Sequence, residues 1–325
     1  MSLETLGRVT ENPTSGCPWC LADHALTSPK VGAPTATWDT IEKRQELSNA
    51  LRVIRGEFGR VCLLDMNRPL VRHAHHHVHF LVKAEGADTF FEVRGANVAL
   101  TDTLGVVMNA WEPHSYVHDP KKPPTIILAF YIEPAWLASY CLDWQYMPDT
   151  QIFSGNHVLL DRTARSYVWE LAQLMVLHPV QTAEHVACLS QLMMHLVRSL
   201  ADQQTLRRSL RELARGSSLL PPVRRALSLI SQEPAIYSDI GTLTRKIGVS
   251  RAHLYRMFED CIGIPPKLYA NAVRIERAIS IVSQPNAKML SISDDLGFSA
   301  PAHFSRFFHD HAGSYPTTWR SAIAE

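Results

Sequence analysis

The sequence predicts an α+β chain with several domains: a β-rich N-terminal half, a helical middle and an all-helical C-terminal part. Three observations support this order. Short apolar or alternating runs recur between residues 58 and 133, and helical periodicity follows over 134–215. Two similar stretches, each with two short helices, then occupy 238–263 and 289–313. The length of 325 residues allows two domains at roughly 100 to 200 residues each.

The composition is that of a globular chain. Hydrophobic residues make up 46% of it and charged residues 19%, and no run of about 18 apolar residues could cross a membrane. The first residues, MSLETLGRVT, lack the basic start and apolar core of a secretory signal, so we expect a cytoplasmic protein. Six scattered cysteines fit free thiols in a reducing compartment: Cys17, Cys20, Cys62, Cys141, Cys188 and Cys261.

The chain begins with a predicted N-terminal arm, residues 1–37, which holds four prolines and shows no apolar period. Leu47, Leu51 and Ile54 then recur at helical spacing, which predicts a short helix within 38–55. We expect this helix to begin the β-rich domain, whose predicted bounds are 38–135.

Five short runs predict the strands of that domain: RVCLLDM, HHVHFLV, TFFEVRG, GVVMNAW and TIILAFYIE. Glycine, proline, asparagine or aspartate separates most of them, and such regular spacing is typical of a sandwich or barrel. Within HHVHFLVKAEGADTFFEVRG we expect a strand, a turn at Glu85-Gly86 and a second strand.

The middle of the chain, residues 136–216, is predicted to be a helical dimerisation segment with helices over 162–177 and 182–214. In the second helix, apolar residues recur at steps of three and four and form one seam: Val186, Leu189, Met193, Leu196 and Leu200. The seam predicts a contact with a partner helix in a homodimer. The other interpretation is packing of the seam on the same chain's β-domain, and both can hold because a helix has two flanks.

Serines and prolines within 217–222 predict a linker at the start of the C-terminal domain, whose predicted bounds are 217–325. Its two similar stretches read SDIGTLTRKIGVSRAHLYRMFEDCIG and MLSISDDLGFSAPAHFSRFFHDHAG. Each predicts a helix, a tight turn at Gly248 or Gly297, and a second helix that ends at Gly263 or Gly313. The pattern is that of two helix-turn-helix units joined by a long helix.

Residues 222–325 resemble the DNA-binding domain of the AraC/XylS family of bacterial transcription regulators. The second unit carries the likeness in Gly297-Phe298-Ser299, His303-Phe304-Ser305-Arg306-Phe307-Phe308, Gly313, Pro316 and Arg320. The first unit matches at Ser250, Leu254, Arg256, Phe258, Gly263, Pro266, Arg274 and Ala278. The resemblance implies a homodimeric regulator, not an enzyme, that binds double-stranded promoter or operator DNA and meets RNA polymerase. No membrane partner is expected.

The N-terminal parts of the two recognition helices supply the candidate DNA contacts: Ser250, Arg251, Ala252, Tyr255, Arg256, Pro301, Ala302, Ser305 and Arg306. Charge supports this placement, because residues 205–325 hold 16 Lys+Arg against 10 Asp+Glu, a net charge of +6. Residues 1–204 hold 16 against 21, a net charge of −5. Glu259 and His309 stand where many family members carry a basic residue, which predicts fewer phosphate contacts.

The likeness extends to the middle of the chain. A small barrel of the cupin kind followed by two dimerising helices is the arrangement of the sugar-responsive members of the family, and YIEPAWLASYCLDW, at 131–144, is similar to their exit from the barrel. In such a barrel, side chains alternate along HAHHHVH, at 73–79, and closure would bring a later strand end beside it. The candidate effector-binding residues are His73, His75, His77, His79, Trp111, His114 and His118.

A metal site is the second interpretation of these histidines. Cupin enzymes bind a metal through two histidines and a glutamate on one strand and a third histidine on a later strand. His73-x-His75 provides the start and His114 the later ligand, but His79 and Phe80 stand where the glutamate is expected. An all-histidine set is similar to zinc sites. A solvated strand end without a ligand is the third interpretation.

Cys17-Pro18-Trp19-Cys20, followed by His24, has metal-ligand spacing but supplies too few ligands for a usual zinc site. A redox pair and two free thiols are the alternatives. The sequence therefore predicts a DNA-binding regulator that responds to a small molecule in the N-terminal barrel. A metal- or redox-sensing regulator is the alternative. A cupin enzyme with a DNA-binding appendage is not expected, since no matched carboxylate accompanies the histidines.

Overall fold

The computed structural model describes residues 48–138, 152–178, 180–202 and 220–323. The chain divides into two compact units, Met1–Pro34 and Thr35–Glu325, and every described residue belongs to the second. The predicted N-terminal arm, the Cys17–Cys20 pair and His24 lie outside the described residues.

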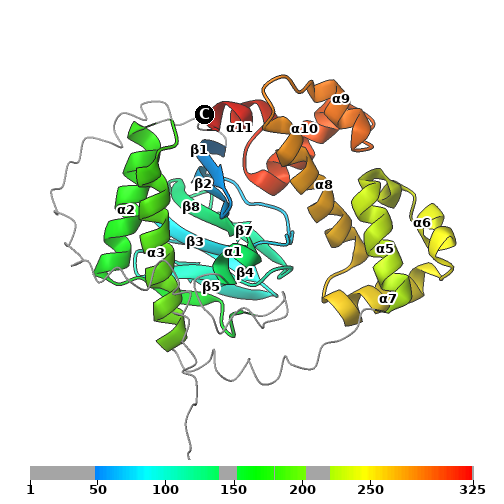
Figure 1. The fold of residues 1–325 in the computed structure, drawn as a ribbon, viewed down its shortest axis with the longest axis horizontal. Coiled ribbons are helices and arrows are strands. Elements are labelled where there is room, and N and C mark those ends of the chain that lie inside the picture. Colours follow the sequence, from blue (N-terminus) through cyan, green and yellow to red (C-terminus); the bar gives the residue numbers. More distant parts are fainter. Residues whose placement is uncertain (1–47, 139–151, 179, 203–219, 324–325) are drawn as a thin grey trace, which may run out of the picture. The chain divides into compact units, whose positions relative to one another are not determined.

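Two antiparallel sheets form the β-domain. The larger has the strand order β1-β2-β8-β3-β6-β9, and the smaller has the order β5-β4-β7 (Figure 1). The strands are β1 (Asn49–Gly56), β2 (Gly59–Met66), β3 (Val78–Gly86), β4 (Thr89–Val93), β5 (Ala96–Leu100), β6 (Leu104–Met108), β7 (His114–Val117), β8 (Thr125–Ile132) and β9 (His157–Leu159).

The helix predicted within 38–55 is wrong over its described part, because β1 occupies Asn49–Gly56. Ile54 pairs with Val61 of β2 in an antiparallel register. The spacing of Leu51 and Ile54 fits a helical turn. Val53, between them, is fully buried too, but it packs in a second core on the other face of the strand. A strand with both faces covered has no single apolar stripe, so its spacing misleads.

The other predicted strands are confirmed, and alternation along β3 divides two cores. Val78, Phe80 and Val82 pack in the core beneath α2 and α3, whereas Leu81 points into the opposite core. The predicted turn lies at Gly86, whose φ of +91° and close approach to the Pro124 carbonyl oxygen leave no room for a Cβ atom.

Helices cover one face of the larger sheet (Figure 1). They follow the short α1 (Pro134–Ala138) and are α2 (Arg162–Leu177) and α3 (Ala183–Asp202). The bounds of α2 are those predicted, and Asp161 begins it by accepting a hydrogen bond from the Ala164 amide at 2.8 Å. Among the described helices, none combines the length and apolar character that crossing a bilayer requires.

The C-terminal part is entirely helical and contains the two predicted helix-turn-helix units. Its helices are α5 (Pro221–Gln232), the 3-10 helix η2 (Pro234–Ser238), α6 (Ile240–Ile247), α7 (Arg251–Ile262), α8 (Pro266–Val282), α9 (Met289–Asp295), α10 (Pro301–Ala312) and α11 (Pro316–Ala322). The long α8 joins the α6–α7 unit to the α9–α10 unit (Figure 1). The core of the first unit is formed mainly by residues of α5 to α8 and includes Ala74 of the β-domain, whereas the core of the second continues deep into the β-domain.

Candidate functional site

The first helix-turn-helix unit is α6 and α7, and Gly248 sets its turn. The φ of Gly248 is +83°, the left-handed conformation expected of a glycine that ends a helix. Ser250 then begins α7, because its hydroxyl accepts a hydrogen bond from the His253 amide at 3.3 Å. The short turn fixes the angle between the two helices.

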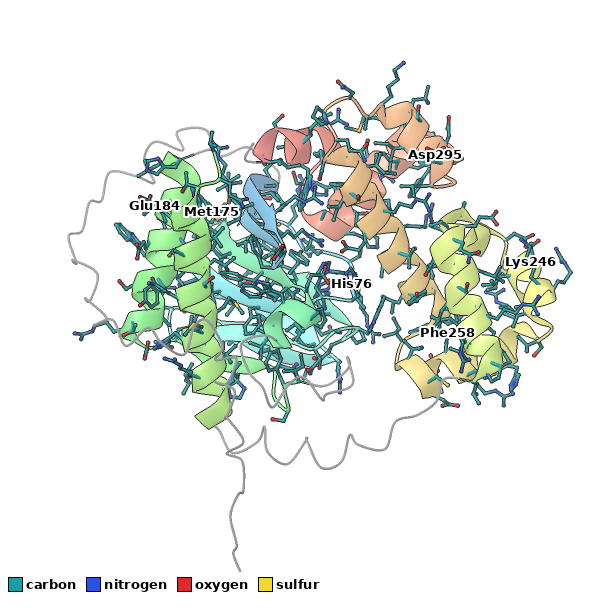
Figure 2. The ribbon with its side chains drawn as sticks, viewed as in Figure 1. His76, Met175, Glu184, Lys246, Phe258 and Asp295 are labelled. Carbon is teal, nitrogen blue, oxygen red and sulfur yellow. The ribbon has the colours of Figure 1, made fainter. Side chains whose placement is uncertain are left out.

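The exposed side of α7 carries most of the predicted DNA contacts. Arg251, Ala252 and Arg256 are exposed, and Leu254 and Phe258 on the opposite side are fully buried. Figure 2 shows Phe258 inside the unit and Lys246 on its outer surface. A helix with this division can present its polar side to a DNA groove while the apolar side holds the unit together.

Tyr255 differs from its neighbours on α7. Its hydroxyl lies 2.5 Å from the hydroxyl of Tyr237 in η2, and the Arg251 guanidinium lies 5.7 Å from its ring centre. The side chain is half-buried. Tyr255 therefore fixes α7 to η2, and its hydroxyl is already engaged before any nucleic acid is bound.

In the second unit, α10 also divides into two sides. Pro301, Ala302 and Arg306 are exposed, and Ser305 is half-buried. On the opposite side Phe304 and Phe308 are fully buried. The residue before the helix, Ala300, supplies no side-chain cap, and the nearby Ser299 hydroxyl instead bonds the His303 ring at 2.8 Å.

Two arginines that the sequence analysis noted only as family matches prove to be structural. The Arg274 guanidinium lies 4.0 Å above the Phe298 ring and donates a hydrogen bond to the Leu296 carbonyl at 2.9 Å. Arg320 donates to the Val282 carbonyl at 2.9 Å and to the Ala287 carbonyl at 2.7 Å. Arg320 thereby satisfies carbonyl groups at and beyond the end of α8.

The histidine stretch lies at the closure of the barrel. The backbones of His73 and His114 exchange hydrogen bonds of 2.8 and 2.9 Å, which confirms that closure brings the later strand end beside the first histidines. The His73 and His114 ring centres are 4.3 Å apart, and the His75 ring is 5.0 Å from that of His114. His79 joins them, because its Nδ1 lies 3.0 Å from Nε2 of His75.

Burial sets the protonation of these rings. It is the main reason that the pKa of His73 is lowered and that the pKa values of His75, His79 and His114 lie well below the ordinary value. Mutual repulsion between the clustered rings adds to the lowering. The four imidazoles are therefore neutral near pH 7 and each keeps one nitrogen lone pair.

His77 takes a different role from the other histidines of the stretch. Its Nε2 lies 3.2 Å from Glu133, and its Nδ1 lies 3.8 Å from Glu276. The strand begins only at Val78, so simple alternation does not extend back to His73. His76 lies beside Glu133 as well, with its Nε2 at 3.4 Å.

The other two predicted effector residues do not reach the cluster with their side chains. Trp111 donates its amide to the His75 carbonyl at 2.7 Å, but its ring packs 4.9 Å from that of Tyr269 in α8. Its φ of +64° is rare for an aromatic residue. His118 bonds the Tyr116 hydroxyl at 3.3 Å.

A tight ion pair links the β-domain to α8. Arg60 of β2 donates two hydrogen bonds of 2.7 Å to the carboxylate of Glu276, and its guanidinium stacks 4.0 Å above the Tyr131 ring. Burial alone would raise the pKa of Glu276, but the charge and hydrogen bonds of Arg60 outweigh it and lower the pKa to about 2.

A cleft of about 580 Å³ borders this ion pair. It is lined by charged and polar groups together with a few apolar ones: Arg55, Gly56, Gly59, Arg60, His76, His77, Glu133, Gln181, Glu276, Ile279, Ser280 and Ile323. By contrast, the two cavities that touch the clustered histidines measure about 10 Å³ each. A cavity of that size holds about one water or one ion, and a sugar ring does not fit.

The apolar seam of α3 packs on its own chain. Leu189, Met193 and Leu196 are fully buried against α2 and the larger sheet, Leu200 is 7% exposed, and Val186 is partly buried. These side chains are therefore not free to meet a partner helix, and packing on the same chain is the outcome. The buried thiols of Cys62 and Cys188 have pKa values raised to about 12, mainly by burial.

Comparison with known proteins defines the class. A family model described as "AraC-like ligand binding domain" matches residues 66–220, and one described as "Helix-turn-helix domain" matches 243–322. The fold is similar to that of an apo single-site variant of ToxT from Vibrio cholerae, with a TM-score of 0.51 at 13% identity over 83% of this chain and 99% of that one.

Two curated relatives each match about a third of this chain. The Msm operon regulatory protein of Streptococcus mutans is 29% identical over 33% of this chain, and an HTH-type transcriptional regulator of Haemophilus influenzae is 28% identical over 30%. The alignments span 39% and 33% of those proteins, so this chain matches well under two thirds of their length.

Fold and matches together define a regulator with a cupin-like ligand-binding domain and a double helix-turn-helix domain. On these two family models the chain belongs to the AraC family of transcriptional regulators.

Proposed function

We propose that this protein is a sequence-specific DNA-binding regulator whose α7 and α10 enter successive major grooves of promoter DNA. The main support is that each helix exposes an arginine on one side, while aromatic and aliphatic residues on the opposite side are buried in the protein. Arg256 and Arg306 occupy these positions. Arginine can donate two hydrogen bonds to guanine, which gives each helix a means to read sequence.

Arg256→Ala tests this proposal. Loss of a two-pronged guanine contact costs about 1–3 kcal/mol of specific binding and relaxes specificity at one base pair. Binding sites are first selected from a random-sequence DNA library with the wild-type protein, and affinities are then compared by electrophoretic mobility shift. Arg277→Ala, an exposed arginine on α8, is the matched control. An unchanged affinity and an unchanged sequence preference for Arg256→Ala would contradict the role of Arg256 in reading the DNA sequence.

The second part of the proposal is control by a small polar effector. The cleft beside Arg60 and Glu276 has the volume for such a molecule, and the 10 Å³ cavities beside the clustered histidines do not. A ligand that pairs with Arg60 competes with Glu276 and weakens the link between the β-domain and α8. A ligand can change the balance between the state with the Arg60–Glu276 pair formed and the state with it broken only if it binds the two states with different affinities.

A thermal-shift screen of small polar molecules tests the cleft as the effector site. A true effector changes the melting temperature of wild-type protein and loses most of its effect in Arg55→Ala, since Arg55 lines the cleft without joining the Arg60–Glu276 pair. Arg94→Ala, which removes a guanidinium outside the cleft, is the control. Molecules that change the melting temperature of Arg55→Ala as much as that of Arg94→Ala bind outside the cleft, and this result would contradict the cleft as the effector site.

We further propose a homodimer that uses the outer surface of α2, because the seam of α3 is occupied. Trp169 and Leu177 of α2 are 38% and 58% exposed, so this helix offers apolar side chains that a second copy of the chain could cover. Analytical ultracentrifugation of Trp169→Glu is the measurement. A dimer of unchanged stability in that variant would place the contact elsewhere. RNA polymerase stays a predicted partner.

A further inference from the structure

The histidines at the closure of the barrel have a feature that packing alone does not require. The rings of His73, His75 and His114 are each 5% exposed or less, and one nitrogen of each lies within 4.8 Å of the corresponding nitrogens of the other two. Three buried imidazoles from two separate segments of the chain thus converge on one point. Two cavities of about 10 Å³ adjoin them.

The hydrogen bonds of the three rings decide which nitrogen is free. Nδ1 of His73 lies 2.8 Å from the Val71 carbonyl, and Nδ1 of His114 lies 2.8 Å from the Glu112 carbonyl. Nδ1 of His75 lies 3.2 Å from the His77 carbonyl. A carbonyl oxygen only accepts, so each Nδ1 carries the proton and each Nε2 keeps its lone pair.

This pattern is the one that metal-binding histidines show. A ligating imidazole usually donates its other ring N–H to a carbonyl or carboxylate, which fixes both the tautomer and the ring direction. In addition, Nε2 of His114 is buried and has no hydrogen-bond partner among the described residues. A buried acceptor without a donor costs free energy that a bound cation would recover.

We propose that His73, His75 and His114 bind one divalent transition-metal ion of the zinc type through their Nε2 atoms. Three neutral imidazoles suit Zn²⁺, and a water or small anion would complete the coordination. Nitrogen atoms bound tetrahedrally to zinc at about 2.0–2.1 Å lie about 3.4 Å apart, so nitrogens now within 4.8 Å of one another must approach by up to about 1.4 Å. The cupin pattern of the sequence analysis includes a glutamate, and this set does not use one.

Occupation of the site has a structural consequence. Nε2 of His75 now accepts a hydrogen bond from Nδ1 of His79 at 3.0 Å. The same lone pair cannot serve a metal, so binding breaks this bond and frees His79. The His79 ring stacks on Tyr131 at 4.3 Å, and Tyr131 lies under Arg60, the partner of Glu276. Metal binding thus changes the packing next to the link to α8.

A second group of possible ligands, His76, His77 and Glu133, borders the cleft. His76 and Glu133 are each 41% exposed, and both histidines already contact the Glu133 carboxylate. Exposed groups that satisfy one another gain less from a metal than buried rings with an unpaired nitrogen. The experiment must nevertheless separate the two groups.

Metal content decides the proposal. Protein without a polyhistidine tag is stripped with a chelator, titrated with Zn²⁺ against a chromophoric competitor, and analysed by mass spectrometry. The expected result is one ion per chain. His114→Gln is expected to weaken binding by more than the roughly 10- to 100-fold typical of losing an outer partner. His157→Gln, an exposed histidine of β9, and Glu133→Gln should bind as the wild type does.

A second measurement needs no variant and covers the case in which His114→Gln does not fold. X-ray absorption at the zinc edge of the loaded wild-type protein should show three imidazole nitrogens. No uptake by the wild type, unchanged uptake in a folded His114→Gln, or uptake lost in Glu133→Gln would each overturn the proposal. DNA affinity with and without zinc is measured separately. The site can therefore stand even where the proposed regulator function fails.

Discussion

The two helix-turn-helix units share a design but differ in what holds them. The α6–α7 unit packs around a core that includes the fully buried Leu254 and Phe258 and is formed mainly by the helices α5 to α8. The α9–α10 unit shares its core with the β-domain, since Phe308 and Trp319 belong to the same apolar cluster as Leu64, Leu81 and Ala129.

Backbone contacts extend the difference between the units. The Val71 amide donates to the Asp310 carbonyl at 3.2 Å, and Val53 of β1 forms a parallel bridge with Ile323. The core of the first unit includes Ala74 of the β-domain, and Trp111 of the β-domain packs on Tyr269 of α8. A change in the β-domain would therefore reach the second unit directly and the first unit mainly through α8.

Truncation of the two cores is the strongest test of this comparison. Trp319 is 1% exposed, and Trp319→Ala should cost about 3–5 kcal/mol of unfolding free energy through lost burial and the cavity that remains. Since the core is shared, amide hydrogen exchange should accelerate in β1 and β2 as well as in α9–α11. Phe258→Ala should have a similar cost but accelerate exchange in the first unit alone. Exchange confined to α9–α11 in Trp319→Ala would contradict a shared core.

The Arg60–Glu276 pair gives the next largest effect. The side chains are 8% and 20% exposed, and removal of one partner, as in Arg60→Met, should cost about 3–5 kcal/mol because a buried carboxylate is left uncompensated. The double variant Arg60→Met/Glu276→Leu should recover much of the loss. Chemical denaturation of the three proteins measures this, and a double variant no better than Arg60→Met would show that the pair is not coupled.

The same pair predicts a dependence on pH. The pKa of Glu276 is about 2 in the folded protein, below its ordinary value of 4.5, so the carboxylate stabilises the fold above about pH 4.5. This contribution, about 3 kcal/mol at most, is lost as the pH falls from 4.5 toward 2. Unfolding free energies between about pH 6 and pH 3 should fall more steeply in the wild type than in Glu276→Gln. Parallel curves would exclude the ion pair as the cause.

The parts of the fold that depend on local patterns could be predicted from the sequence. The bounds of α2 follow from one apolar stripe and the Asp161 cap, and both units follow from glycine turns at fixed offsets. The strand β1 was missed because both of its faces are buried, so Leu51 and Ile54 imitate a helical spacing. The seam of α3 was correctly located, but a pattern does not reveal which surface covers it.

The site at the closure of the barrel was predictable only in part, because a local sequence pattern does not show which distant residues it meets. His73, His75 and His114 follow from an His-x-His pair and barrel closure, and the structure brings them together. His77 could not be separated from them, since the extended strand begins only after it. The Arg60–Glu276 pair joins residues 216 apart in the sequence, and no local signal marks either residue.

The smallest expected effect concerns the starts of the two recognition helices. Ser250 caps α7 through its hydroxyl, whereas Ala300 offers no cap to α10. Ser250→Ala should cost about 1 kcal/mol and loosen the first turn of α7, where Arg251 and Ala252 lie. Ala300→Ser should leave α10 unchanged or slightly more stable. Local exchange rates in the two helices measure this. An equal response of both would mean that α7, like α10, is held by its packing and not by its cap, and the contrast between the units would then be confined to their cores.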